Sequence, residues 1–142
     1  MHSEEMNKFE FLLGDWNLEY RIPKSVLGQA GSDSGTGSFR RFLNDKYVSF
    51  DYSTGTGVGA HAIFAWDDKV KVYKFCWFEN SGNFSTATCN FVGDNILAMN
   101  WHDSLLVQTF AKDGPDRVIL RMQNPGSHGA YELALEVIFT RK

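Results

Sequence analysis

Short runs of alternating apolar and polar residues, separated by tight turns, fill most of this chain of 142 residues. In the first run, Trp16, Leu18 and Tyr20 alternate with polar residues, which is typical of a strand with one buried face. Further runs lie near 38–43, 46–54, 58–66, 69–79, 84–92, 95–102, 104–111, 117–124 and 131–141. Because the connections between these runs are short, we expect antiparallel neighbours; parallel strands would need much longer crossovers.

A meander of about ten antiparallel strands is unstable as an open sheet, because such a sheet exposes two edges and one apolar face. Closing the sheet on itself removes both problems. We therefore predict an all-β fold for residues 1–142, a single domain built as an antiparallel up-and-down barrel of about ten strands. The hydrophobic content of 43% and the aromatic content of 15% are sufficient for its core.

The only helical pattern lies at the start of the chain. Ser3 is a suitable N-cap, and Gly14 is a suitable end for the helix. Between them, apolar residues recur at helical spacing, namely Met6, Phe9, Leu12 and Leu13. We predict a short helix over residues 3–13 that plugs one end of the barrel.

A segment rich in Gly and Ser covers residues 24–38 and follows the first strand. Its low complexity between two strand-like runs is typical of a loop. We predict that this segment is a mobile loop that gates the barrel interior.

Composition argues against several classes of protein. The formal net charge of -3 lacks the surplus of Lys and Arg that phosphate binding needs, so we expect no nucleic-acid partner. No stretch reaches the ~18 consecutive apolar residues of a membrane helix, and the first residues do not resemble a secretory signal. We therefore expect a cytoplasmic protein without a membrane partner.

Cys76 and Cys89 match no metal-binding spacing, so we expect reduced, packed thiols and no metal site.

Both ends of the chain carry a recognisable pattern. Gly14-Asp15-Trp16 opens the first strand, and Arg141 lies on the last strand, on the same predicted inward face as Leu133, Leu135, Val137 and Phe139. This arrangement resembles the calycin superfamily of lipocalin-like barrels, in which a Gly-x-Trp on the first strand packs against an Arg on the last. The resemblance implies that Arg141 covers the ring of Trp16 and closes the barrel.

Within that superfamily the chain is most similar to a bacterial family of lipocalin-like domains of unknown function. The shared features are the run from Leu12 to Trp16, the Trp66-Asp67 turn, the aromatic pair of Tyr73 and Trp77, and the closing Thr140-Arg141-Lys142. The resemblance implies a barrel but little about function, because the family has no settled activity.

Two better-characterised kinds of barrel fit less well. Fatty-acid-binding barrels hold a carboxylate with an Arg-x-Tyr pair on their last strands, and this chain has no such pair. Haem-binding nitrobindin-like barrels share the Gly-x-Trp but need an axial His near the end of the chain, where His128 lies in a predicted turn. The sequence therefore predicts no cofactor.

Alternate positions of the predicted strands would line the barrel interior with apolar side chains and a few hydroxyl and indole groups, as in small-molecule pockets. A barrel of about ten strands is wider than the eight-stranded case that side chains just fill, so we expect a cavity. Candidate ligand contacts are Tyr20, Phe50, Tyr52, His61, Tyr73, Trp77 and Met122. The predicted function is binding of a small apolar or amphipathic molecule, with no catalytic residue assigned.

Two alternatives stay open. Apolar residues on both faces of 58–66, among them Ile63 and Trp66, favour a side-chain-filled barrel that forms a homodimer, because such a strand normally keeps one polar face. The other alternative is an enzyme in which His61 acts as the base, since an imidazole titrates near neutral pH.

Overall fold

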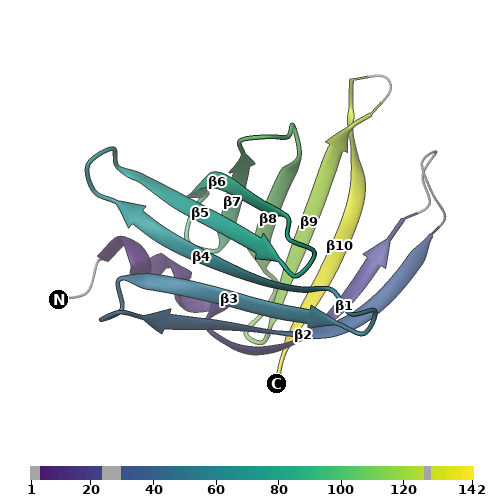
Figure 1. The fold of residues 1–142 in the computed structure, drawn as a ribbon, viewed down its shortest axis with the longest axis horizontal. Coiled ribbons are helices and arrows are strands. Elements are labelled where there is room, and N and C mark those ends of the chain that lie inside the picture. The colour runs from purple at the N-terminus through teal and green to yellow at the C-terminus, as the bar shows by residue number, and fades with distance from the viewer. Residues whose placement is uncertain (1–3, 24–29, 127–128) are drawn as a thin grey trace.

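Ten antiparallel strands close into a barrel in the computed structural model, which describes residues 4–23, 30–126 and 129–142 (Figure 1). Each strand pairs with its neighbours in sequence, and the first strand also pairs with the last. The 3₁₀ helix η1 (Glu4–Leu12) precedes the strands β1 (Gly14–Ile22), β2 (Gly31–Phe42), β3 (Tyr47–Thr54), β4 (Gly59–Asp67), β5 (Val72–Glu79), β6 (Phe84–Phe91), β7 (Ile96–Trp101), β8 (Val107–Lys112), β9 (Arg117–Pro125) and β10 (Tyr131–Arg141). The predicted all-β, up-and-down barrel with an N-terminal helix is confirmed.

Helix η1 covers one end of the barrel, which we call the closed end (Figure 1). Its buried residues are Met6, Phe9 and Leu12, each 0% exposed. Their spacing of three suits a 3₁₀ helix, in which each turn takes three residues and such side chains lie in one row. Leu13, expected on the same face, lies after the helix, and Ser3 lies outside the described residues.

In the described part of the chain, no helix is long and apolar enough to cross a membrane.

The predicted contact between Trp16 and Arg141 is present where the barrel closes. These residues are opposite each other in the β1–β10 pairing, and the Arg141 guanidinium carbon lies 4.2 Å from the centre of the indole. The Arg141 Nη1 donates to the carbonyl oxygen of Leu13 at 2.6 Å, and the Trp16 Nε1 donates to that of Leu12 at 2.8 Å. The same two side chains therefore join the last strand to the first and to the end of η1.

The loop prediction for residues 24–38 is wrong in its second half, because residues from Gly31 onward form β2. Without this strand β1 would keep an unpaired edge; instead it pairs with β2 from Gly14 opposite Phe39 to Ile22 opposite Gly31. Glycines make this pairing fit, since a Cβ at Gly35 would lie 2.1 Å from the backbone oxygen of Ser53 on β3. The low complexity thus marks close backbone approach within a strand. Residues 24–29 lie outside the described residues, so the predicted gate is untested there.

A β-bulge in β10 corrects one further expectation. The pairing with β9 shifts between Leu133, which is opposite Gln123, and Leu135, which is opposite Met122. Leu133 is consequently 37% exposed instead of facing inward, because a bulge moves the residues beyond it to the other face. The rest of the strand keeps the predicted parity, and Val137 and Phe139 are buried.

The two cysteines are unpaired, as predicted. Cys89 is buried, but Cys76 is exposed, which corrects the expectation that both thiols are packed. The reason is strand parity, since Cys76 alternates with the inward-facing Phe75 and Trp77 on β5.

Candidate functional site

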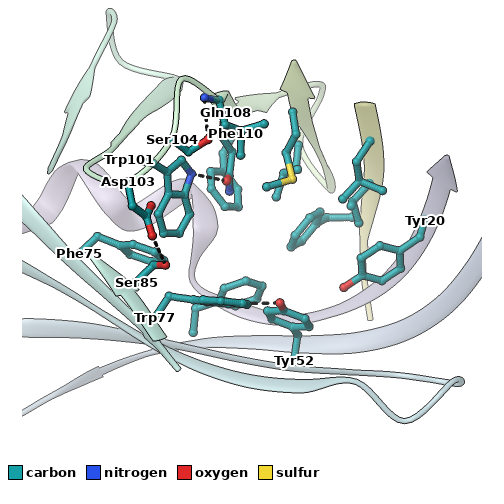
Figure 2. Close-up of a pocket in the computed structure, with 17 residues that line it drawn as sticks. Tyr20, Tyr52, Phe75, Trp77, Ser85, Trp101, Asp103, Ser104, Gln108 and Phe110 are labelled. Carbon is teal, nitrogen blue, oxygen red and sulfur yellow. Dashed lines mark hydrogen bonds between the residues drawn. The ribbon is translucent and has the colours of Figure 1, made fainter. Parts of the chain in front are cut away.

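An apolar cavity of about 260 Å³ occupies the barrel interior toward the end opposite η1. We call this the open end. Tyr20, for example, lies four residues along β1 from Trp16, which contacts the end of η1. The cavity lies between side chains from both sides of the barrel (Figure 2). Its walls are Tyr20, Phe50, Tyr52, Phe75, Trp77, Ser85, Trp101, Asp103, Ser104, Leu106, Gln108, Phe110, Leu120, Met122, Leu135, Val137 and Phe139.

Aromatic contacts fix the shape of one wall. The ring of Trp101 lies edge-on to that of Phe75, with centroids 5.4 Å apart, and edge-on to that of Trp77, with centroids 6.3 Å apart. Such edge-to-face contacts are favourable because the positive edge of one ring meets the negative face of the other. Below this wall, Phe50 and Phe110 pack against each other in the middle of the barrel. The indoles are therefore held in place before any guest enters.

The indole N–H groups are satisfied by side chains of the cavity. The Trp77 Nε1 donates to the Tyr52 hydroxyl at 3.2 Å, and the Trp101 Nε1 donates to the Gln108 Oε1 at 3.0 Å (Figure 2). Both acceptors also carry donors, because a phenol has one O–H and a primary amide has two N–H groups. Tyr52 and Gln108 thus accept from the wall and still have hydrogens to donate.

Gln108 is notable because it is a polar side chain at a core position. It is only 5% exposed, and its amide nitrogen has no acceptor among the described residues. The described residues do not fully enclose this nitrogen, and a guest that covered it without offering an acceptor would incur a cost of about 1–3 kcal/mol. Since Gln108 lines the cavity, these donors are placed where a guest would supply the missing acceptor.

Tyr20 adds a further hydroxyl from the opposite side of the cavity (Figure 2). Burial raises the pKa of Tyr20 far above its ordinary value, with smaller contributions from Tyr52 and Asp33. Burial also raises the pKa of Tyr52, with the hydrogen bond from Trp77 opposing and the charge of Glu79 reinforcing the effect. Both phenols therefore stay protonated at physiological pH and can donate hydrogen bonds.

Charge around the cavity is of one sign. Among the described residues, none of those that line it is a Lys, Arg or His. The single charged lining residue is Asp103 at the mouth, whose Oδ2 accepts a hydrogen bond from the Ser85 hydroxyl at 3.0 Å. Asp33 and Glu79 act on the two tyrosines from nearby. The described lining thus holds one carboxylate, with two more nearby, and no cation to balance an acidic guest.

The structure brings together five of the predicted contacts, which are Tyr20, Phe50, Tyr52, Trp77 and Met122. It places the other two elsewhere. Tyr73 faces inward but at the closed end, where its hydroxyl donates to the backbone oxygen of Glu5 at 2.7 Å. His61 is exposed on the outer face of β4, with its Nδ1 2.5 Å from the Asp51 Oδ1, because the inward positions of that strand belong to Ala62 and Phe64.

Sequence reasoning missed the contribution of the β6–β8 region to this cavity. Trp101, Gln108 and Phe110 all line it and none was a candidate contact. One available signal was the alternation of Leu106, Gln108 and Phe110, which has the period of an inward strand face. A glutamine at the centre of that alternation predicts a polar group on the inner face of the barrel, which is typical of a binding site.

Metal binding gains no support from side-chain clusters. Within the residues that the structure describes, no group of three or more His, Cys, Asp or Glu side chains could hold a metal ion. His128, considered above as a haem ligand, lies outside those residues.

Together these features define a class of protein, a lipocalin-like β-barrel with an apolar internal cavity near one end. No protein-family model and no curated protein matches the sequence. Solved structures do match. Rv2717c from M. tuberculosis has a TM-score of 0.67 at 11% identity over 100% of this chain and 99% of that one.

Two further solved structures share the fold. The S-type phycobiliprotein lyase CPES from Guillardia theta has a TM-score of 0.62 at 12% identity, covering 99% of this chain and 98% of that one. A de novo designed fluorescence-activating β-barrel has a TM-score of 0.51 at 14% identity, covering 96% and 98%. At these identities the likeness establishes the lipocalin-like fold and nothing about activity.

Proposed function

We propose that this protein binds a small, largely apolar molecule non-covalently inside its barrel. The observation that carries this proposal is an aromatic cavity of about 260 Å³ that is lined by the hydroxyls of Tyr20 and Tyr52 and the amide of Gln108. Side chains that merely fill a core leave few voids larger than a water molecule. The volume lies just below the usual range of ligand pockets, which begins at about 300 Å³, so the guest is small.

The fold neighbours are in keeping with this proposal. One is a phycobiliprotein lyase and another is a designed barrel described as fluorescence-activating. That support is an analogy of fold, and the site itself carries the proposal.

The alternative of a filled barrel agrees less well with this cavity. Among the apolar residues of 58–66 that favoured a homodimer, Phe64 is fully buried inside the barrel, and Ile63 and Ala65 are partly buried on the outside. A dimer through the outer face of β4 stays a prediction, which the mass in solution would test. The alternative of a reaction with His61 as base gains no support, because His61 does not reach the cavity.

Trp77→Ala tests the proposal, with 2-acetylnaphthalene as the probe and isothermal titration calorimetry as the measurement. We expect the wild type to bind the probe and the variant to bind at least about fivefold more weakly, because one wall of aromatic contact is lost. Phe84→Ala is the matched control, since that ring is 71% exposed on the outer surface.

Native mass spectrometry of the protein purified from its own host gives an independent measurement, in which a copurified small molecule is expected. Absence of probe binding by the wild type, or equal affinities for wild type and Trp77→Ala, would contradict the proposed function.

A further inference from the structure

We propose that the guest is an uncharged, flat molecule of one or two fused rings that carries a carbonyl-type hydrogen-bond acceptor, and that the site discriminates against carboxylates. This inference rests on the proposed function and specifies its ligand class. Three features of the cavity carry it, namely its shape, its unpaired donors and the sign of the nearby charges.

Shape sets the size and flatness of the guest. The volume of about 260 Å³ is enclosed by rings on the β3, β5, β7 and β8 side and by aliphatic side chains of β9 and β10, including Leu120, Leu135 and Val137. The rings of Trp77 and Trp101 stand almost perpendicular to each other, at 83°. A flat ring system can lie along the face of one indole while it meets the edge of the other, so both favoured aromatic geometries are used at once.

Unpaired donors set the polar group of the guest. The Gln108 Oε1 already accepts one hydrogen bond, from Trp101, and no acceptor is found for the Gln108 N–H groups among the described residues. Tyr52 likewise accepts from Trp77 and offers its O–H, and Tyr20 brings a second phenol across the cavity (Figure 2). Each of these two oxygens thus has one lone pair already used by an indole, while the donor hydrogens of Tyr20, Tyr52 and Gln108 are free to meet a guest. A carbonyl oxygen, with two lone pairs, can accept from two such donors at once.

Charge excludes acidic guests. A carboxylate that enters an apolar site must lose its hydration, which is tolerated only where a cation or several donors compensate. The described lining holds no cation, and Asp103 lies at the mouth through which an anion would pass. Asp33 and Glu79 add negative charge close to Tyr20 and Tyr52. A neutral carbonyl satisfies the same donors without this cost.

Three probes with the same naphthalene ring and nearly the same size separate these requirements at pH 7.5. They are 2-ethylnaphthalene, which has no acceptor, 2-acetylnaphthalene, which has a neutral one, and 2-naphthoate, which is an anion. We expect the acetyl compound to bind about two- to tenfold more tightly than the ethyl compound, the range of one net hydrogen bond. We expect 2-naphthoate to bind at least about tenfold more weakly than the acetyl compound, because its charge is desolvated without a partner.

The outcomes separate this inference from the function on which it rests. If none of the probes binds, the proposed function fails and the ligand class fails with it. If 2-naphthoate binds as tightly as the acetyl compound or more tightly, the protein remains a binding barrel and the ligand class is wrong. Equal affinities for the ethyl and acetyl compounds would likewise show that the donors are not used.

Tyr20→Phe identifies the donor by a change that leaves no protein group unpaired, since no hydrogen bond of the Tyr20 hydroxyl is found among the described residues. We expect this variant to lose about two- to tenfold in affinity for 2-acetylnaphthalene and nothing for 2-ethylnaphthalene. Gln108→Met repeats the test at the second donor, with thermal unfolding recorded to separate misfolding from lost recognition. Tyr47→Phe, at the closed end of the barrel, is the control. If both cavity variants keep the wild-type preference for the acetyl compound, the assigned donors are wrong.

Discussion

The closed and open ends of this barrel both consist of aromatic side chains, but they treat polar groups differently. At the closed end the Trp16 indole, the Tyr73 hydroxyl and the Arg141 guanidinium each donate to a backbone carbonyl of η1 or its end. At the open end the indoles donate to side chains that keep spare hydrogens of their own. These donors of the closed end are thus paired within the chain, although Arg41, whose Nη2 bonds Asn7 and Glu10 of η1, keeps a buried Nη1 without a partner among the described residues. The open end leaves its donors toward a cavity that a guest can enter.

Packing differs in the same direction. Phe9 of η1 lies in contact with the rings of Phe64, Tyr73 and Phe91, with centroids 4.9 to 5.6 Å apart, and is itself 0% exposed. The open end has no such plug in the described residues, and its rings surround the cavity. An N-terminal segment that caps one end of a barrel therefore determines which end can receive a ligand.

The largest expected difference between the ends comes from truncating one tryptophan at each. Trp16→Ala should lower the free energy of unfolding by about 3–5 kcal/mol, because it leaves a cavity at a buried site and removes the ring that Arg141 packs against. Trp77→Ala should cost only about 1–2 kcal/mol, since its ring already borders a cavity. Urea titrations of both variants measure the difference. Equal losses would show that the open end is packed as tightly as the closed one.

Removing the cation at the closed end should have a smaller effect. Arg141→Met keeps most of the apolar stem but loses the contact with Trp16 and the bond to the Leu13 carbonyl. We expect a loss of about 1–3 kcal/mol in the free energy of unfolding, and no change in affinity for 2-acetylnaphthalene. Arg121→Met is the control, since Arg121 pairs with Glu136 on the exposed surface, where such pairs contribute at most about 1 kcal/mol. A weaker effect of Arg141→Met than of its control would contradict the closure role.

The closed end was also the easier one to predict from the sequence. Its determinants are local or periodic: Met6, Phe9 and Leu12 repeat every third residue, and the parity of β10 places Arg141 on the inward face. The open end depends on contacts between strands that are far apart in sequence. Nothing in the order of residues shows that Trp101 and Gln108 form a hydrogen bond, or that Tyr20 lies across from them.

Two errors have a common physical cause, which is that a strand's face depends on its partners. Composition predicts a loop at Gly35 and Gly37, yet both lie in β2, where a Cβ would meet the β3 backbone at Gly35 and the side chains of Phe50 and Leu18 at Gly37. Leu133 was placed inside by parity, yet the bulge in β10 turns it outward. His61 is a candidate contact by residue type, yet it lies exposed on the outer face of β4. Composition and residue type were thus weaker guides than alternation, and alternation failed only at the bulge.

Alkaline pH should act on the closed end through Tyr73. Burial, reinforced by Glu5 and Cys89, raises the pKa of Tyr73 from its ordinary value of 10.0 to about 12. A raised pKa means that the fold favours the neutral phenol, so this stabilisation is complete below about pH 10 and is lost as the pH rises toward 12. Tyr73→Phe should be less stable than the wild type at pH 8 because it lacks the bond to Glu5, and this difference should shrink above pH 10. Urea titrations at pH 8, 10 and 11 measure it, with Tyr47→Phe as the control. A difference that grows with pH would have the wrong sign.

Ligand binding at the open end should show almost no dependence on pH, which is the smallest effect expected here. The described lining contains no histidine, and the pKa values of Tyr20 and Tyr52 are raised by burial, so their hydroxyls keep their protons throughout the range from pH 6 to 9. The affinity for 2-acetylnaphthalene should therefore stay within about twofold over this range. His61→Ala should leave it unchanged at each pH, because His61 lies on the outer face beside Asp51. A break in affinity near neutral pH that disappears in His61→Ala would place a titrating imidazole in contact with the guest. The distinction between a sealed end and a receptive end would then have to include the outer face of β4.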